Sequence, residues 1–314
     1  MAVHIIDFLR WNPSARKRHP EGYNPFLFRV KKAQDEENYD AVGIAHGTDT
    51  LSYTATALAF GLHGKDPRSS GLRIPVCITG SQNPVYEPGG DGRFNLENLF
   101  RTLEKSMEFG AADVLVNFWD QVLLGCRSLK TSEKKFDAFK SPAFPVVGTI
   151  DGAGVSFDSK SIHKTEDAGS RLNIAPKFGK GVISLELTPG IDPNLVLGFV
   201  TNGGVSAMIL KSLGEGNVCT EGIFNLLPVI TQITKDYLTP IFITTKFVGG
   251  NATSAHYEVG LKAIQSGGIA CYDHTDVAVD VKVRWLLGNG VCSDVESFRH
   301  AMRTSYAGEV TEIK

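Results

Sequence analysis

The sequence has few cysteines and no long apolar run. Five cysteines are scattered among 314 residues and form no C-x-x-C pair, which argues against a disulfide framework and favours reduced thiols inside the cell. No apolar stretch approaches the ~20 residues that cross a bilayer, and the first residues lack the cationic start and apolar core of a signal peptide. We therefore expect a cytoplasmic protein with no membrane attachment.

The sequence also lacks a charge excess and several common site signatures. The net charge is −2 at pH 7, which gives no reason to expect nucleic acid as a partner. There is no G-x-G-x-x-G after an apolar run, no phosphate-binding loop, no G-x-S-x-G and no H-x-x-x-H pair. These absences argue against nucleotide cofactors, serine-hydrolase chemistry and zinc, so we expect no cofactor and no metal.

The first half of the chain alternates continuous apolar runs with helical patterns. The runs at 40–46, 74–80 and 113–118 are typical of strands buried on both faces of a parallel sheet. The intervening segments 48–64 and 91–110 place apolar residues at helical spacing and end in glycine. The alternation of strand and helix predicts an α/β domain with right-handed crossovers.

A second α/β pattern follows a polar segment. The strand patterns V-I-S-L-E-L, A-M-I-L-K-S-L and P-I-F-I-T-T-K-F are followed by helical ones. The last helix is predicted to start at Ser293, because Ser293 and Glu296 have capping-box spacing. We predict two α/β domains in series: a larger N-terminal parallel-sheet domain over 1–158, a linker over 159–179, and a smaller C-terminal domain of the flavodoxin or Rossmann type over 180–314.

Polar clusters follow two of the predicted strands. His46-Gly47-Thr48-Asp49-Thr50 follows the first, and Gly80-Ser81-Gln82-Asn83 follows the second. Ligands in open α/β sheets bind beyond the carboxyl ends of the strands, and free amides at a helix start suit a carboxylate or a developing oxyanion. A simple helix cap is the competing interpretation of Thr48 or Asp49 alone. Two hydroxyls, a carboxylate and a histidine within five residues favour a site.

A third polar group, Arg127-Ser128-Leu129-Lys130-Thr131, follows another apolar run. A lysine close to a carboxylate and a threonine hydroxyl can exchange protons with them. An isolated lysine is usually a solvated surface charge, so a role for Lys130 depends on its coming close to Thr48 and Asp49 in the folded chain.

Taken together, these segments resemble the bacterial-type L-asparaginase/glutaminase family, especially its cytoplasmic type I branch. The resemblance runs from about Tyr39 to the end of the chain. It is carried by H-G-T-D-T, T-G-S-Q followed by D-G-R-F-N-L, R-S-L-K with a later A-F-K-S-P, L-G-E-G-N, and a closing A-G-E. The first three motifs at these separations form a specific combination.

The resemblance implies a homodimer or homotetramer that hydrolyses the side-chain amide of L-asparagine or L-glutamine without metal or cofactor. In the family a threonine hydroxyl attacks the amide carbonyl, and a threonine, aspartate and lysine set moves protons. Carried onto this sequence, the set is Thr48, Asp49 and Lys130. The substrate-binding positions are Gly47, Ser81 and Gln82, with Asn217 of the second domain reaching a neighbouring subunit's site.

One family motif is missing from the sequence. Family members begin with T-G-G-T-I, whose second threonine is the usual nucleophile, and T-G-G-T-I does not occur in this chain. The segment after H-I-I-D-F can be placed over the family's D-S-S segment, which gives Ser14 as a substrate-binding candidate. Three expectations stay open: a truncated gene model of an active asparaginase, a non-catalytic relative that binds amino acids or completes an oligomer, and an amidohydrolase that uses Thr48 as nucleophile.

Overall fold

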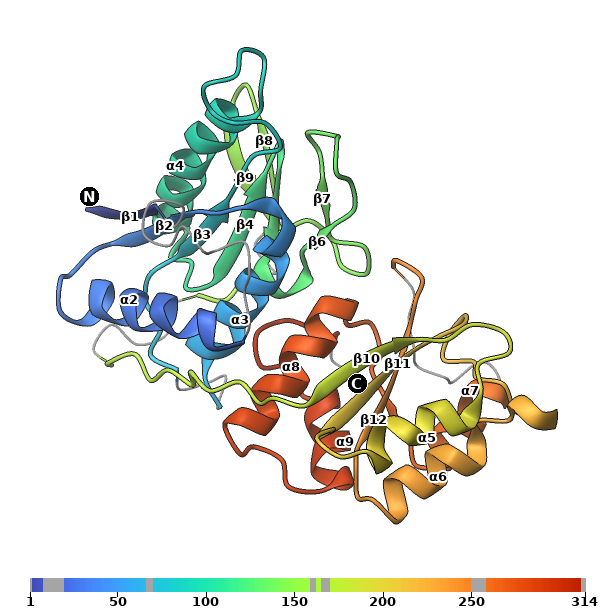
Figure 1. The fold of residues 1–314 in the computed structure, drawn as a ribbon. Helices are drawn as coiled ribbons and strands as arrows, with labels where there is room; N and C mark the ends of the chain where they lie inside the picture. The colour runs from blue at the N-terminus through green and yellow to red at the C-terminus, as the bar shows by residue number, and fades with distance from the viewer. Residues whose placement is uncertain are drawn as a thin grey trace. The chain divides into compact units, whose positions relative to one another are not determined.

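The chain forms two compact units, each with its own sheet. The computed structural model describes residues 2–7, 20–65, 70–158, 162–164, 170–249 and 258–311. The first unit comprises Met1–Lys177 with Tyr306–Gly308, and the second comprises Phe178–Ser305 with Glu309–Lys314. The predicted architecture of two α/β domains in series, the larger one first, is confirmed (Figure 1). The predicted linker over 159–179 falls partly outside the described residues and stays a prediction.

The first unit is built on a seven-stranded sheet of order β1-β2-β3-β4-β5-β8-β9. Its strands are β1 (Val3–Asp7), β2 (Ala41–Ala45), β3 (Val76–Thr79), β4 (Val114–Phe118), β5 (Gln121–Leu124), β8 (Gly148–Asp151) and β9 (Gly154–Phe157). The first four strands run parallel, and the last three pair antiparallel. Because β2, β3 and β4 lie in the middle of the sheet, nearly all of their side chains are buried, as their continuous apolar sequences predict.

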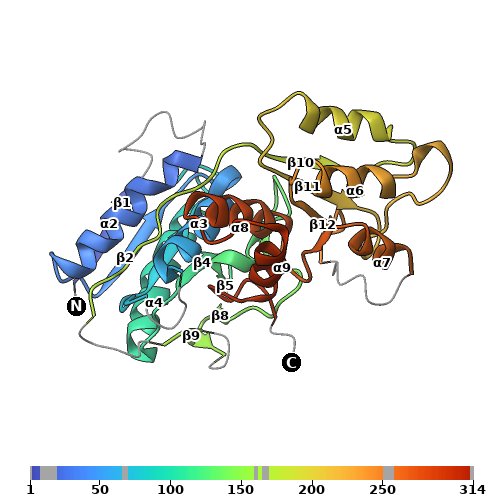
Figure 2. The same cartoon turned by 90° about the horizontal axis from the view of Figure 1, so that it is seen from below.

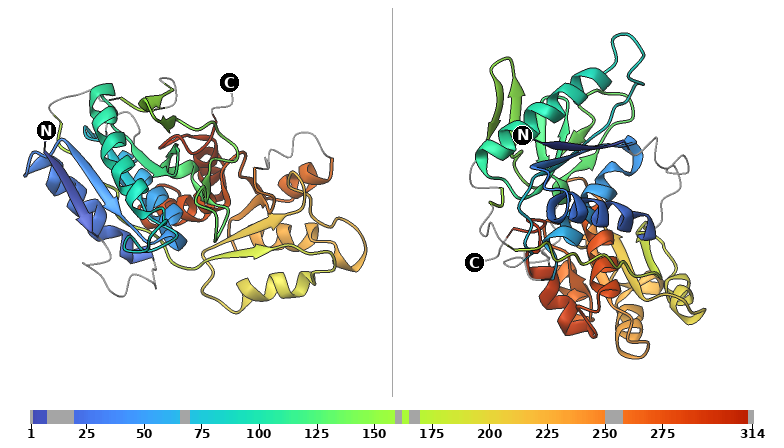
Figure 3. Two further views of the ribbon diagram at one scale, coloured as in Figure 1. Left: turned by 90° about the horizontal axis from the view of Figure 1, so that it is seen from above. Right: turned by 90° about the vertical axis from the view of Figure 1, so that its left-hand side faces the viewer.

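Helices cover both faces of this sheet. They are η1 (Pro20–Tyr23), α2 (Asn24–Asp35), η2 (Thr48–Thr50), α3 (Leu51–His63), α4 (Gly92–Phe109) and η3 (Gly125–Arg127), and a separate hairpin is formed by β6 (Leu129–Lys130) and β7 (Phe139–Lys140). Helix α4 packs on one face, and α2 and α3 lie on the other (Figure 3). Helix α4 ends at Phe109 and is followed by Gly110, whose left-handed φ of 70° suits a residue without a Cβ.

The second unit has four parallel strands in sequential order. They are β10 (Val182–Glu186), β11 (Ala207–Ser212), β12 (Ile241–Thr245) and β13 (Ile269–Ala270). Its helices are α5 (Pro193–Thr201), η4 (Gly222–Phe224), α6 (Leu227–Lys235), α7 (Glu258–Gln265), α8 (Asp276–Gly288) and α9 (Val295–Arg303). Seen along this sheet, α5, α6 and α7 lie on one side and α8 and α9 on the other (Figure 2).

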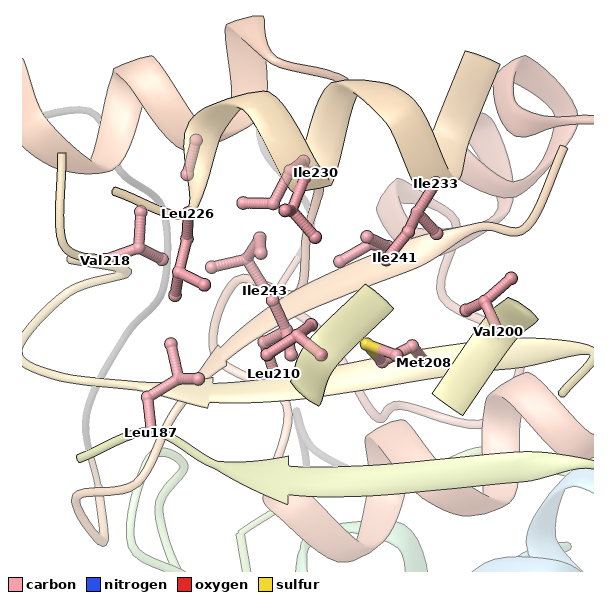
Figure 4. Close-up of a cluster of buried hydrophobic side chains, with 13 residues drawn as sticks. Leu187, Val200, Met208, Leu210, Val218, Leu226, Ile230, Ile233, Ile241 and Ile243 are labelled. Atoms are coloured by element: carbon pink, nitrogen blue, oxygen red, sulfur yellow. The ribbon is translucent and has the colours of Figure 1, made fainter. Parts of the chain in front are cut away.

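A cluster of buried aliphatic side chains joins this sheet to α6. Leu226, Ile230 and Ile233 face Leu210 and Ile243 of the central strands (Figure 4). Leu226 directly precedes α6, and Ile230 and Ile233 follow it at helical spacing on one side of the helix, so burial of that side fixes α6 on the sheet. None of the helices in the described residues combines the length and the apolar character needed to span a bilayer.

The start of the last helix differs from the prediction. Helix α9 begins at Val295, and its cap is Asp294, whose carboxylate accepts from the Ser297 amide while the Ser297 hydroxyl accepts from the Asp294 amide. The predicted pair of Ser293 and Glu296 is wrong by one residue. The reason is physical: a carboxylate is as good a cap as a hydroxyl, and a serine can take the place of glutamate in the reciprocal bond.

The thiols give a first testable prediction. All five cysteines lie in the described residues and none of them forms a disulfide; four are buried, whereas Cys219 is exposed. Burial raises the pKa of the Cys77 thiol to about 12 and that of Cys292 to about 11. Because the thiolate is the reactive form, we expect a disulfide reagent such as DTNB to modify one thiol per native chain rapidly and all five after denaturation. The variant Cys219→Ser should abolish the rapid phase, and rapid modification of that variant would contradict the burial described here.

Candidate functional site

The site is built around the segment that follows strand β2. The strand ends at Ala45, Gly47 is extended, and the chain then winds through the short helix η2 into α3. This path places the Thr48 and Asp49 side chains at the carboxyl end of a central strand. It also places them at the start of a helical segment, where the first amide groups have no acceptor within the helix.

The structure brings Lys130 to this segment, as the site hypothesis requires. The Lys130 ammonium donates to Thr48 Oγ1 at 2.8 Å and to Asp49 Oδ1 at 2.7 Å. The Lys130 side chain is 18% exposed, whereas that of Asp49 is 93% exposed. The Lys130 ammonium therefore contacts both the Thr48 hydroxyl and the Asp49 carboxylate, and of these groups the carboxylate is the one exposed to solvent.

Gln82 contacts the same hydroxyl from the next loop of the sheet. Thr48 Oγ1 donates to Gln82 Oε1 at 3.4 Å, and Gln82 Nε2 donates to the carbonyl oxygens of Ser132 at 3.1 Å and Lys135 at 3.2 Å. The carbonyl contacts fix which end of the Gln82 amide faces Thr48. The threonine hydroxyl thus lies between a positively charged donor and a neutral acceptor.

Two residues of the α4 start that the sequence analysis did not assign hold this loop in place. Both carboxylate oxygens of Asp91 accept from the backbone N–H of Gln82 at 3.0 Å. The side chain of Asn95 donates to the Gly80 carbonyl at 2.9 Å and accepts from the Trp119 amide at 2.9 Å. Both residues are buried. The D-G-R-F-N-L motif was the only sequence signal for them, and it carries positioning groups for the T-G-S-Q loop.

Arg127, three residues before Lys130, is buried. The Arg127 side chain is 1% exposed, its Nε donates to the Gly308 carbonyl at 2.7 Å, and its guanidinium lies 4.6 Å from the centre of the Phe144 ring. Lys130 itself pairs with Phe139 in the β6–β7 hairpin. The R-S-L-K sequence therefore combines a buried arginine with the lysine that contacts Thr48 and Asp49.

Gly80 allows the two loops of the site to approach each other. A Cβ at this position would lie 2.4 Å from the His46 carbonyl oxygen and 3.3 Å from Thr48 Cγ2. Real Cβ atoms do not approach a backbone oxygen so closely, and neither backbone can yield without moving the site.

We therefore expect Gly80→Ala to lower the free energy of unfolding by about 1–3 kcal/mol, as overpacking does elsewhere. Urea denaturation followed by circular dichroism measures this loss. Gly47→Ala is the matched control, because a Cβ there meets nothing within 4 Å and Gly47 has an ordinary φ of −69°. Equal stability of the two variants would contradict the close approach at Gly80.

The other residues predicted for the site lie in different parts of the chain. Ser81 lies in the T-G-S-Q loop beside Gln82, next to Gly92 of α4. Asn217 belongs to the second unit, where its amide donates to the Leu213 carbonyl at 2.7 Å in the turn after β11. Ser14 lies outside the described residues. The structure thus brings together Thr48, Asp49, Lys130 and Gln82 within one unit.

Comparison with known proteins fits this arrangement. Residues 17–163 match the family model "Asparaginase, N-terminal", and residues 181–302 match "Glutaminase/Asparaginase C-terminal domain". The chain is 31% identical over 292 residues to an L-asparaginase of Thermococcus kodakarensis, covering 93% of this chain and 82% of that protein. The chain belongs to the asparaginase family. The predicted family resemblance is confirmed.

Two further matches place the chain within the asparaginase family. The solved thermostable L-asparaginase from Thermococcus kodakarensis aligns with a TM-score of 0.82 at 31% identity, covering 95% of this chain and 84% of that one. A glutamyl-tRNA(Gln) amidotransferase component of the same organism is 27% identical over 317 residues, covering 98% of this chain and 67% of that protein. Relatives of both kinds therefore share sequence similarity with nearly the whole of this chain.

Proposed function

We propose that this chain is an amidohydrolase that converts L-asparagine to L-aspartate and ammonia, with Thr48 as the attacking hydroxyl. The observation that carries the proposal is the contact of Thr48 Oγ1 with the Lys130 ammonium, which in turn holds Asp49. Asparaginase-family membership supports the reaction type. A hydroxyl in contact with a group that can take and return its proton is the usual arrangement of a covalent nucleophile.

The reaction proceeds in two halves. Lys130 gives one ammonium proton to the Asp49 carboxylate, which it contacts at 2.7 Å, and Thr48 Oγ1 attacks the side-chain amide carbon while its own proton passes to the amine so formed. The carbonyl oxygen becomes an oxyanion beside backbone amides of the helix start. The C–N bond then breaks, the nitrogen takes up a proton from Lys130, and ammonia leaves an ester on Thr48. Water attacks the ester, releases L-aspartate and restores the hydroxyl.

The remaining predicted residues have supporting roles in this proposal. Gln82 orients the Thr48 hydroxyl, and Gly47 and Ser81 shape the floor on which the substrate lies. Ser14 holds the substrate's charged α groups, and Asn217 completes the site of a neighbouring subunit in a homodimer or homotetramer. We further propose L-glutamine as the competing substrate and the cytoplasm as the place of action, with no nucleic-acid or membrane partner.

The test is release of ammonia from L-asparagine by the purified chain. We expect turnover in the native chain, loss of turnover in Thr48→Ala, and partial retention in Thr48→Ser, which keeps a hydroxyl. Circular dichroism confirms that each variant is folded. Equal turnover in the native chain and Thr48→Ala would show that another group attacks the amide.

A second candidate rests on the lack of T-G-G-T-I in the sequence. A relative that binds the amino acid without hydrolysing it needs the pocket but no nucleophile. Calorimetry separates the two functions: saturable binding of L-aspartate with no ammonia released from L-asparagine favours the binding protein. Co-purification with a second asparaginase-like chain favours a partner role in a mixed oligomer.

A further inference from the structure

A group of two histidines and an aspartate lies apart from the Thr48 site; His63 and Asp113 are buried, and His163 is exposed. His63 is the last residue of α3, Asp113 directly precedes β4, and His163 follows the β8–β9 hairpin. One atom from each side chain lies within 4.8 Å of the others. The three residues come from separate parts of the first unit, at successive sequence distances of 50 residues.

We propose that His63, Asp113 and His163 bind one divalent transition-metal ion of the zinc type. Two imidazoles and one carboxylate form a donor set that suits Zn²⁺, with a water molecule as fourth ligand. The proposal is independent of the amide hydrolysis, because the metal would serve the fold and take no part in the reaction.

The geometry of the group fits this ion. His63 Nε2 lies 3.2 Å from Asp113 Oδ1, and His163 Nδ1 lies 2.8 Å from Asp113 Oδ2. Around a zinc ion with ligands at ~2.0–2.1 Å, tetrahedral ligand atoms are spaced by roughly 3.3 Å. The two imidazole rings are 4.8 Å apart at an angle of 51°, so they lie side by side without stacking flat. Small movements of the side chains convert hydrogen bonds into coordination.

Backbone groups hold the proposed ligands in place. The Val114 amide donates to Asp113 Oδ1 at 2.8 Å, and the His163 amide donates to Asp113 Oδ2 at 3.1 Å. The Ala112 amide donates to the His163 carbonyl at 2.9 Å, which ties the histidine segment to the start of β4. Outer-shell hydrogen bonds of this kind orient metal ligands in known sites.

Access also favours a metal ion. The side chains of His63 and Asp113 are 4% and 1% exposed, whereas that of His163 is 43% exposed. An ion can therefore enter from the His163 side and lose most of its water on binding. The nearby Lys164 ammonium lies over the Phe109 ring at 4.1 Å.

The proposed metal lies at the opposite end of α3 from the Thr48 site. Helix α3 has 13 residues and starts just after Thr48, so the two sites are separated by about 20 Å at ~1.5 Å per residue. A metal at His63 would fasten the end of this helix to β4 and to the segment around His163. We expect it to raise the melting temperature and to leave the attacking hydroxyl unchanged.

The experiment uses the full, untagged chain after treatment with a chelator, with Co²⁺ as spectroscopic probe and Zn²⁺ as competitor. We expect one equivalent of Co²⁺ per chain, visible absorption typical of a tetrahedral site, its loss when Zn²⁺ is added, and a melting temperature that rises with metal concentration. No saturable binding would overturn the proposal.

Two variants test whether the ion binds at His163. His163→Gln can still donate to Asp113 but offers a poor ligand, and we expect its affinity for Co²⁺ to fall more than about tenfold, since even outer-shell changes cost as much. His300→Ala removes an exposed histidine of α9 and should bind Co²⁺ like the native chain. Equal binding by native chain and His163→Gln would place the ion elsewhere and overturn the proposal. Ammonia release from L-asparagine is expected to be the same with and without the metal.

Discussion

Replacing Lys130 by methionine is expected to reduce ammonia release from L-asparagine by about a thousandfold or more, within the range that proton-transfer groups contribute. The Lys130 ammonium is the group in hydrogen-bond contact with both Thr48 Oγ1 and Asp49 Oδ1, at 2.8 Å and 2.7 Å. Methionine keeps the length and apolar stem of the side chain but can neither take the hydroxyl proton nor balance the carboxylate. The steady-state rate of ammonia release at saturating L-asparagine measures the effect.

The neighbouring hairpin supplies the control. Lys140 of β7 pairs across from Leu129, next to Lys130, and its ammonium contacts Asp137 at 3.0 Å outside the site. Lys140→Met removes the same charge from the same hairpin and should leave turnover within about twofold, because surface ion pairs contribute little. Unchanged turnover in Lys130→Met would mean that the site is wrongly assigned, whatever the control shows.

Much of the first sheet could be predicted because its strands are buried on both faces. The continuous apolar sequence of β2, β3 and β4 leaves few alternatives to a central parallel strand. Short edge elements such as β13, of two residues, have no such pattern. The capping residue of α9 was predicted one residue early, since Ser293, Asp294 and Ser297 offer overlapping capping patterns that differ only in backbone geometry.

The candidate site could be predicted where its residues lie within sequence motifs. Thr48 and Lys130 are 82 residues apart, and strand order alone does not bring them together, because β5, the last strand of the sheet before Lys130, runs antiparallel to β4. The family resemblance supplied the pairing. By contrast, Asp91 and Asn95 act through backbone amides and carbonyls of other loops, and such contacts leave no spacing signal in a single sequence.

The sequence also carries no signal for the group formed by His63, Asp113 and His163. Metal signatures depend on ligands close in sequence, such as H-x-x-x-H, whereas these ligands come from a helix end, a strand start and an irregular segment. The sequence patterns therefore predicted no metal. Only the tertiary fold places the three side chains together.

A second large effect is expected from the buried ion pair of the second unit. Lys282 Nζ lies 2.6 Å from Glu309 Oε1, and both side chains are fully buried. The Lys282 ammonium also donates to the Thr304 carbonyl at 2.8 Å. Glu309→Gln would leave this buried cation without its counter-charge, and we expect a loss of about 3–5 kcal/mol in the free energy of unfolding. Urea denaturation followed by circular dichroism measures it.

Two comparisons show whether the loss comes from the uncompensated charge. Glu108→Gln removes one partner of an exposed pair with Lys105, whose contact is 3.0 Å, and should cost no more than about 1 kcal/mol. The double variant Lys282→Met/Glu309→Gln removes both charges and should recover most of the stability, because a buried pair replaced as a whole is often neutral. A double variant as unstable as Glu309→Gln alone would mean that Glu309 acts through shape and hydrogen bonds. In that case Glu309 of the A-G-E motif would stabilise the fold through packing and hydrogen bonds and not through its charge.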